Sequence, residues 1–393
     1  MKKHIELFMA SWQAILIGVV ALAGLGALLL YKLTSLVGGF SAIEKATANQ
    51  VAASGLGNLT GNLPGAVASV LNFVLPITMP SSLRLTAAIF GFLSVVGMYY
   101  VISNWFSRFM GLVGAVLLAT ASWFLHVSRY GSLDGVIFLC LPILIAVLIM
   151  AQKHRFSFGY NYLALLAAAA TIYVPGLIII TVILTVLQRQ LFFKRFKRFS
   201  LQQRIIAVVS VILLWAPALY SVWASPSQIM IKIFGINVTG ITAASVSGHA
   251  TTILQFIFTG GIMSPITTLG SLPQLDILSS VMFVLGLVAI FKHRGLLRAK
   301  LLAIILILYI GLVLVGGVTL NALLVPIYLI VIYGICYYLK LWLKTFPRNP
   351  IARTTGYVAI SLAVSLVSLY HLTNYFVAWP RASTTQSSFQ QSP

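Results

Sequence analysis

Acidic residues are what this chain has least of. Its 393 residues include four, Glu6, Glu44, Asp134 and Asp276, against 25 Lys and Arg. The chain is 60% hydrophobic and its mean hydropathy is +1.04, which indicates that the bilayer is its solvent. Ionisable groups are costly in that solvent, so each of the four acids calls for a physical reason.

Cysteines and phosphate-binding loops are also scarce. The two cysteines, Cys140 and Cys336, lie inside apolar runs, so they predict small hydrophobic side chains rather than a disulfide or a metal site. No His, Cys or acid spacing predicts a metal site built by the protein. The sequence also has no glycine-rich phosphate loop and no nucleophile elbow.

The excess of positive charge does not point to nucleic acid. The formal net charge is +21, but the cations stand in short clusters between apolar runs. Cytoplasmic loops of membrane proteins have this pattern. We therefore expect no nucleic-acid partner.

Long apolar runs recur along the chain, each near the ~20 residues that cross a hydrocarbon core of ~30 Å. They predict an all-α fold, a polytopic helical bundle of about eleven transmembrane helices. The predicted spans are 13–32, 84–103, 109–127, 134–151, 160–173, 175–190, 205–223, 277–292, 300–317, 321–339 and 356–376.

Pro175 leaves two interpretations of residues 160–190, because proline removes a backbone donor. The segment is either two short helices or one kinked helix, and the second reading inverts everything downstream. Charge favours two helices. With the N-terminus in the cytoplasm, only six cations then lie outside: Lys32, Lys45, Arg84, Arg129, Lys232 and Arg381. The prediction is a multi-pass plasma-membrane protein with an extracytoplasmic C-terminus.

This topology predicts one transmembrane domain, residues 1–380, with two long extracytoplasmic loops at 33–83 and 224–276. Residues 381–393 have no core-forming pattern, so we expect a disordered extracytoplasmic tail. Within the first loop, 40–53 has helical spacing and predicts a juxtamembrane helix with Phe40, Ile43 and Val51 on one face. Residues 64–73 predict a second.

The same topology places Glu44, Arg129 and Asp134 on the outer side. Each also has a simpler explanation. Asp134 suits a helix cap or a first-turn acid, Arg129 suits a headgroup contact, and Glu44 suits a solvated surface position. Asp276 precedes a span and is best explained as another helix cap.

Several short motifs resemble a known family. The segments Ser81–Gly91 and Ser122–Asp134 contain an Arg-Leu at the start of a span and a Ser-Arg…Asp entry to a later one. Asn321–Tyr328 and Asn374–Pro380 are similar to the entry and exit of late spans. Together, in this order, they resemble glycosyltransferase family 39, whose GT-C fold includes protein O-mannosyltransferases and the lipid A aminoarabinose transferase.

The resemblance implies a membrane enzyme that transfers a sugar from a polyprenyl-phosphate donor to a lipid, glycan or protein acceptor on the extracytoplasmic face. It implies that Glu44, with Asp134, is catalytic, Glu44 as the base for the acceptor hydroxyl. Arg84 and Arg129, with Lys45 and Lys232 behind them, are then the candidates for the donor phosphate. The family has an adjacent Asp-Glu pair where this chain has Ile43-Glu44.

No cofactor follows with certainty, and a divalent cation is the one we keep as a candidate. Membrane lipids are further expected partners. Two other functions stay open. A transporter or lipid flippase is weakened by the absence of a clear internal repeat, and a non-catalytic relative fits the missing acidic partner.

Overall fold

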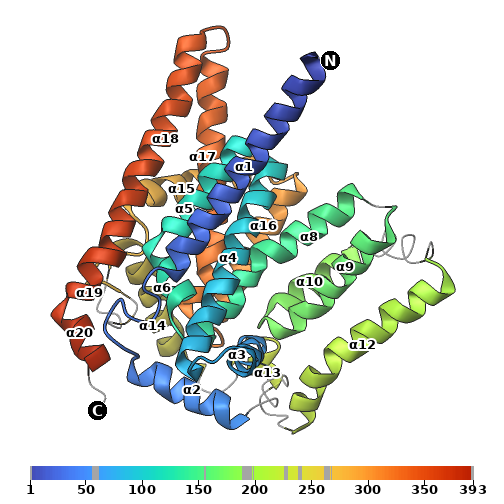
Figure 1. The fold of residues 1–393 in the computed structure, drawn as a ribbon, viewed down its shortest axis with the longest axis vertical. Coiled ribbons are helices and arrows are strands. Elements are labelled where there is room, and N and C mark those ends of the chain that lie inside the picture. The colour runs from blue at the N-terminus through green and yellow to red at the C-terminus, as the bar shows by residue number, and fades with distance from the viewer. Residues whose placement is uncertain are drawn as a thin grey trace.

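The computed structural model describes the chain apart from residues 1, 55–61, 155, 188–196, 198, 225–228, 238–240, 261–265, 267 and 391–393. The described residues form helices and no strand, as the sequence predicted. Figure 1 shows an elongated bundle: α1, α17 and α18 reach its upper end, and α2, α3 and α20 lie at its lower end. We call the lower end the α2 end.

The first half of the chain contains α1 (Lys2–Leu30), α2 (Ala42–Ser54), α3 (Leu63–Val74), α4 (Met79–Trp105), α5 (Arg108–Thr120), α6 (Ser122–Arg129), α7 (Leu133–Val136), η2 (Ile137–Cys140), α8 (Leu141–Lys153), α9 (Phe158–Ala170), η3 (Thr171–Tyr173) and α10 (Leu177–Leu187). The second half contains α12 (Leu201–Ala224), α13 (Ile229–Lys232), α14 (Ala243–Leu254), η5 (Gln255–Thr259), α15 (Ile277–Lys292), α16 (Leu297–Leu314), η6 (Leu320–Leu323), α17 (Leu324–Thr345), α18 (Pro350–Thr373), η7 (Asn374–Ala378), α19 (Trp379–Arg381) and α20 (Ser383–Gln390).

The core of the bundle is built around α17 and α4. Of the most apolar stretch of α17, 89% is buried in protein, against 61% for α4 and 11% for α12. Helix α17 crosses α15 closely because glycines face the crossing: Gly286 lies against the carbonyl of Ile330, and Gly334 lies against that of Met282. Small residues let helix backbones approach in this way inside a membrane.

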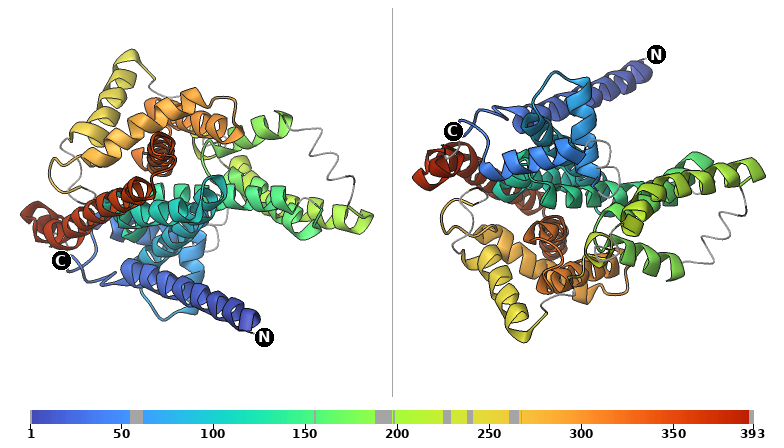
Figure 2. Two further views of the ribbon diagram at one scale, coloured as in Figure 1. Left: turned by 90° about the horizontal axis from the view of Figure 1, so that it is seen from above. Right: turned by 90° about the horizontal axis from the view of Figure 1, so that it is seen from below.

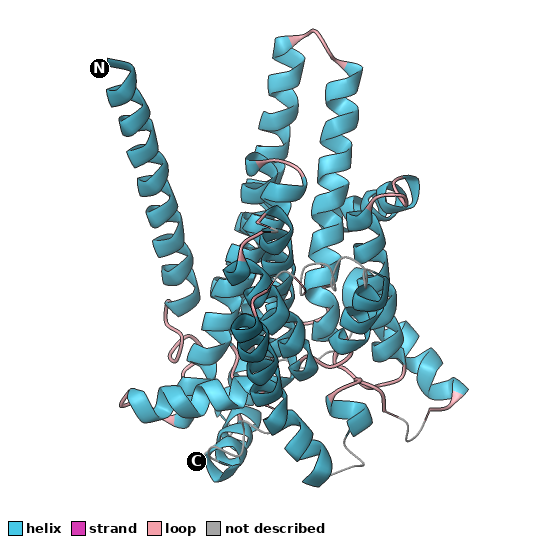
Figure 3. Ribbon diagram, turned by 90° about the vertical axis from the view of Figure 1, so that its right-hand side faces the viewer, coloured by secondary structure: helices cyan, strands magenta, loops and turns pink. Residues whose placement is uncertain are grey.

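Some helices lie at the margin of this core. Figures 2 and 3 show the first part of α1 standing away from the other helices, and Figures 1 and 2 show α12 at the edge. In α1, Leu16 and Ile17 are 62% and 68% exposed to the surroundings. Exposed apolar side chains of this kind are ordinary where lipid is the solvent.

Each of the eleven predicted spans overlaps an apolar helix. Among the described residues, five helices are long and apolar enough to cross a bilayer, or six if the bent pair α5 and α6 is one span. The remaining predicted spans correspond to shorter apolar helices. The chain is therefore an integral membrane protein.

Two breaks interrupt the apolar helices. Helices α5 and α6 meet at Ala121 with a bend of 65°. The second break follows η3, where Gly176 has a φ of +79°, and α10 begins at Leu177. The described part of 160–190, up to Leu187, thus forms two helices, as charge favoured, because proline and left-handed glycine together end the first.

Both predicted juxtamembrane helices are present, as α2 and α3, but the predicted face of α2 was wrong. The buried side chains of α2 are Glu44, Ala48 and Val51, whereas Ile43 is 54% exposed. The apolar pattern misled because a charged residue, Glu44, occupies the buried stripe at the i, i+4, i+7 spacing.

The C-terminal tail also differs from its prediction of disorder. Ser383–Gln390 forms α20, and residues 391–393 lie outside the described part. Phe389 is buried against Trp379, with ring centroids 5.8 Å apart, and Gln386 donates to the carbonyl of Pro380. One aromatic side chain with a docking partner outweighs the polar composition of this short segment.

Candidate functional site

The candidate site starts from the N-terminus of α2. Ser41 precedes the helix, and its hydroxyl accepts a hydrogen bond from the backbone N–H of Glu44 at 3.2 Å. The Glu44 carboxylate accepts one in return from the N–H of Ser41 at 3.0 Å. This reciprocal pair is a capping box, which satisfies two backbone donors that the helix itself leaves unpaired.

Arg84, in the second turn of α4, contacts this cap through the Glu44 carboxylate. Its Nε donates to Oε1 of Glu44 at 2.7 Å, and its Nη2 donates to Oε2 at 2.7 Å. The Glu44 side chain has no exposed surface, and that of Arg84 is 5% exposed. The pair is therefore a buried, two-point ion pair, the strongest geometry that an arginine and a carboxylate form.

Two further groups complete the surroundings of Glu44. The N–H of Gly131 donates to Oε1 at 2.9 Å, so four donors in all surround the carboxylate. The hydroxyls of Ser41 and Tyr130 lie 2.7 Å apart beside it. Burial, together with the nearby charge of Glu44, raises the pKa of Tyr130 to about 12, so its hydroxyl stays neutral.

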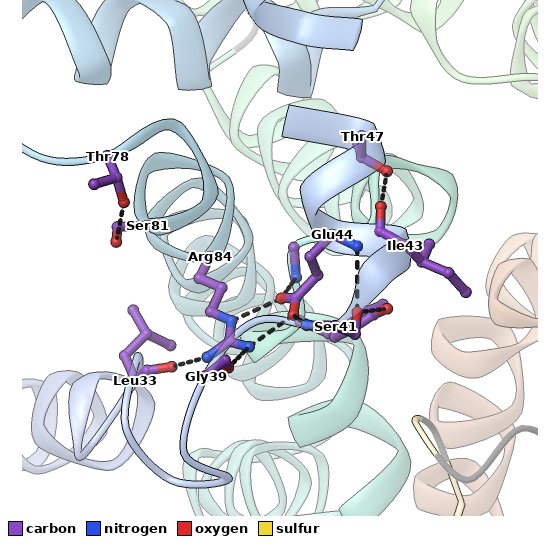
Figure 4. A network of polar contacts seen from close by, with 11 residues as sticks. Leu33, Gly39, Ser41, Ile43, Glu44, Thr47, Thr78, Ser81 and Arg84 are labelled. Atoms are coloured by element: carbon purple, nitrogen blue, oxygen red, sulfur yellow. Dashed lines mark hydrogen bonds and ion pairs between the residues drawn. The ribbon is translucent and has the colours of Figure 1, made fainter. Parts of the chain in front are cut away.

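The remaining donors of Arg84 hold the segment that joins α1 to α2, residues 31–41. Nη1 donates to the carbonyl of Leu33 at 2.9 Å, and Nη2 also donates to that of Gly39 at 2.8 Å. The ring of Phe40 lies 4.6 Å from the guanidinium carbon. Figure 4 shows this segment wrapped around Arg84, with Glu44 on the other side.

Arg129 plays a parallel part at the end of α6. It is 3% exposed and donates to the carbonyls of Leu28 and Tyr31, at the C-terminal end of α1. The rings of Tyr375 and Phe376 lie 5.4 and 4.9 Å from its guanidinium carbon. Its Nε is buried without a hydrogen-bond partner among the described residues. Carbonyls at a helix C-terminus attract cations, which explains this placement.

The structure thus brings Glu44 and Arg84 into direct contact, and it seats Arg129 on the same α1 end. Asp134 lies in the first turn of α7, and its side chain is outside the described part. Lys45 is half-buried and Lys232 is exposed at the end of α13. Among the described side chains, no ion pair joins either lysine to Glu44.

Sequence reasoning missed a second polar cluster, which we call the Asp276 cluster: Ser122, Asp276, Ser279 and His371. Asp276 is the N-cap of α15, as predicted, and accepts from the N–H of Ser279 at 2.9 Å. Nε2 of His371 donates to the same carboxylate at 3.1 Å, while Nδ1 lies 3.1 Å from the Ser122 hydroxyl. His371 is 95 positions from Asp276 and 249 positions from Ser122, so no local sequence pattern could have revealed the cluster.

The Asp276 carboxyl is held in its ionised form, and the space beside the cluster is too small for a sugar. Burial raises the pKa of the Asp276 carboxyl, but hydrogen bonds from His371 and Ser279 outweigh it and hold the pKa below its usual value. The cavity beside the cluster measures about 20 Å³. That is space for about one water molecule. In this arrangement the cluster ties α6, α15 and α18 together.

Comparison with protein-family models and with curated proteins finds no match. Solved structures of similar fold include two membrane glycosyltransferases. ArnT from Cupriavidus metallidurans matches with a TM-score of 0.53 and 14% identity, over 97% of this chain and 77% of that one. The Archaeoglobus fulgidus oligosaccharyltransferase matches with a TM-score of 0.52 and 15% identity, over 96% of this chain and 56% of that one. The chain therefore has a GT-C-type fold.

Proposed function

We propose that this protein transfers a sugar from a polyprenyl-phosphate donor to a lipid, glycan or protein acceptor at the extracytoplasmic face of the membrane. In this proposal, residues 1–380 form one membrane domain, the N-terminus is cytoplasmic, and the α2 end faces outward. The GT-C-type fold and its membrane glycosyltransferase neighbours support the general activity.

The observation that carries the proposal is the two-point contact between Arg84 and Glu44. A guanidinium fork that matches two carboxylate oxygens also matches two phosphate oxygens. The donor phosphate can therefore replace the Glu44 carboxylate on Arg84. The exchange frees Glu44 at the moment when the donor is bound.

The freed carboxylate then has a defined task. The acceptor hydroxyl oxygen attacks the anomeric carbon, the bond from that carbon to the phosphate oxygen breaks, and Glu44 takes the hydroxyl proton. Negative charge grows on the leaving phosphate, where Arg84 stabilises it with Arg129 nearby. Lys45, Lys232 and Asp134 remain proposed members of this site, the lysines for the phosphate and Asp134 for the chemistry.

In the present arrangement the site is closed. Glu44 has no exposed surface, and Arg84 also holds the carbonyls of Leu33 and Gly39 in the 31–41 segment. The guanidinium that would bind the phosphate is thus the group that keeps this segment in place. Donor binding and opening of the segment are one event in this proposal.

A non-catalytic role is the second candidate, and one observation favours it. All four donors around Glu44 come from the protein, so the carboxylate already has a complete structural role. A relative that had lost activity could retain this arrangement as a scaffold for α1, α2 and α4.

The experiment compares wild type with Glu44→Gln in membranes supplied with a panel of radiolabelled polyprenyl-phosphate sugars. We expect Glu44→Gln to reduce transfer by about 10²–10⁴-fold, as loss of a general base does. Glu6→Gln is the control, because it removes a carboxylate from the start of α1. Equal transfer by wild type and Glu44→Gln removes Glu44 from the chemistry. A folded wild type that is inactive with the whole panel supports the non-catalytic role.

A further inference from the structure

A large cavity lies away from the site described above, between α8, α9, α10 and α16. Its volume is about 480 Å³, within the ~300–1,000 Å³ range of small-molecule sites. Most of its wall is apolar, from residues such as Leu144, Leu148, Leu165 and Leu301. Ala164 and Ala168 of α9 and Thr171 of η3 line it at one-face spacing, so small side chains form this wall of the cavity.

One end of this cavity is polar and cationic. Arg298, at the start of α16, lines it together with Trp105 and Gln152. The half-buried guanidinium of Arg298 donates to the carbonyl of Trp105 and lies 4.6 Å from the ring of Phe106. These contacts fix the position of the cation beside the cavity.

Arg298 has no anionic partner among the described side chains. The ion pairs there involve Glu44 and Asp276, at the α2 end. Lys292, Arg294 and Lys300 flank Arg298 along the chain and add positive charge. A partly buried cation without a counter-ion is costly, and an anion held beside it removes that cost.

We propose that this cavity binds an anionic phospholipid of the cytoplasmic leaflet, with an acyl chain along the Ala164–Ala168 face and the phosphate at Arg298. The positive-inside pattern assigns this end of the bundle to the cytoplasm. Anionic lipids of that leaflet are attracted to clustered Lys and Arg near the membrane surface. The occupant is therefore argued from charge as well as from volume.

The bound lipid has a mechanical consequence. Helices α9, α10 and α12 lie beside the core rather than within it, as Figures 1 and 2 show. An acyl chain in the cavity fills the space between α9 and α16 and supplies packing contacts to both. Close packing of this kind is what holds helices together where no hydrophobic effect acts between them.

The test measures lipid binding to the purified full-length chain in detergent by native mass spectrometry. The probes are palmitoyl-oleoyl phosphatidylglycerol and palmitoyl-oleoyl phosphatidylcholine, which differ in headgroup charge. We expect wild type to prefer phosphatidylglycerol and Arg298→Gln to bind it about fivefold more weakly, with the preference gone. Ala168→Phe fills the cavity and should lose both lipids. Lys344→Gln, an exposed cation on α17, should behave as wild type.

Thermal midpoints without added lipid show whether each variant is folded, and Ala164→Leu replaces Ala168→Phe if that variant fails. Equal binding of the two lipids by wild type overturns the proposal. So does a preference for phosphatidylglycerol that survives in Arg298→Gln, or full binding by a folded cavity-filling variant. Displacement of phosphatidylglycerol by an equal amount of polyprenyl phosphate overturns the choice of occupant. None of these readouts depends on the proposed transferase activity.

Discussion

Arg84 and Glu44 form a buried ion pair in which the guanidinium donates to both carboxylate oxygens at 2.7 Å. Arg84 comes from α4 and Glu44 from α2, and Arg84 also holds two carbonyls between α1 and α2. One contact therefore fixes three helices at the α2 end. Whatever chemistry occurs here has to act on this contact.

The pair makes a direct prediction about stability. Arg84→Gln leaves the Glu44 carboxylate buried without its cation, which should cost about 3–5 kcal/mol. Glu44→Gln should also destabilise, since it strands Arg84. The double variant should lose clearly less free energy of unfolding than the two single variants lose together, because neither charge is then left without its partner. Thermal or denaturant unfolding in detergent measures all three.

Arg108→Gln is the control for this cycle, because Arg108 is an exposed cation at the start of α5. It should change stability by less than about 0.5 kcal/mol. Strict additivity of the Glu44 and Arg84 losses would mean that the two side chains do not depend on each other.

The pair also shows how far the sequence could be interpreted. Ser41 and Glu44 have the Ser-x-x-Glu spacing of a capping box, so the local role of Glu44 was readable. Its ion pair with Arg84 was not, because forty residues separate the two. The sequence did predict the all-helical fold, both juxtamembrane helices and the cap at Asp276, since each depends on local periodicity or on one capping residue.

The failures have a common physical origin. The buried face of α2 was wrong because a paired carboxylate can occupy a core position that the pattern reserves for apolar groups. The tail was predicted to be disordered because its composition is polar, yet Phe389 docks on Trp379. In both places one side-chain contact, and not the composition of the segment, decides the outcome. The catalytic and phosphate-binding roles remain predictions.

The close crossing of α15 and α17 gives a second prediction. A methyl group on Gly334 would overlap the carbonyl of Met282, and one on Gly286 would overlap that of Ile330. Backbone atoms cannot step aside as a flexible side chain can, so either change to Ala should cost about 1–3 kcal/mol. The measurement is the thermal midpoint in detergent.

Gly311→Ala is the matched control, because Gly311 lies in the helix α16 with no atom within 4 Å of an added methyl group. Alanine is the better helix former, so this variant should be neutral or slightly stabilised. If all three variants behave alike, helix propensity and not the crossing determines the effect.

The Asp276 cluster predicts a dependence of stability on pH. The pKa of the Asp276 carboxyl is held below its usual value, so the folded state favours the ionised form. This contribution is complete above the unfolded pKa of about 3.9 and is lost as pH falls through the lower folded value. Asp276→Asn keeps an N-cap but removes the charge.

The difference in thermal midpoint between wild type and Asp276→Asn should therefore be largest above about pH 5 and shrink as pH falls through 3.9. Glu6→Gln serves as a second carboxylate change, outside the cluster. A constant difference across the whole pH range would show that Asp276 acts through shape and not through charge.

The orientation of the chain in the membrane can be tested with single cysteines. Ser54 is exposed at the end of α2, and Ser200 is exposed just before α12. The excess of Lys and Arg assigns the first to the outside and the second to the cytoplasm.

Both native cysteines are changed to Ala first, so that only the new thiol reacts. An impermeant maleimide added to intact cells should then label Ser54→Cys at once and Ser200→Cys only after the membrane is opened. Labelling of both in intact cells would mean that an even number of crossings separates them, and not the five that the sequence predicts. It would also move the Lys and Arg cluster next to Ser200 to the outer face, against the charge rule. Labelling of Ser200→Cys alone would invert the protein, and the Glu44–Arg84 pair would then face the cytoplasm.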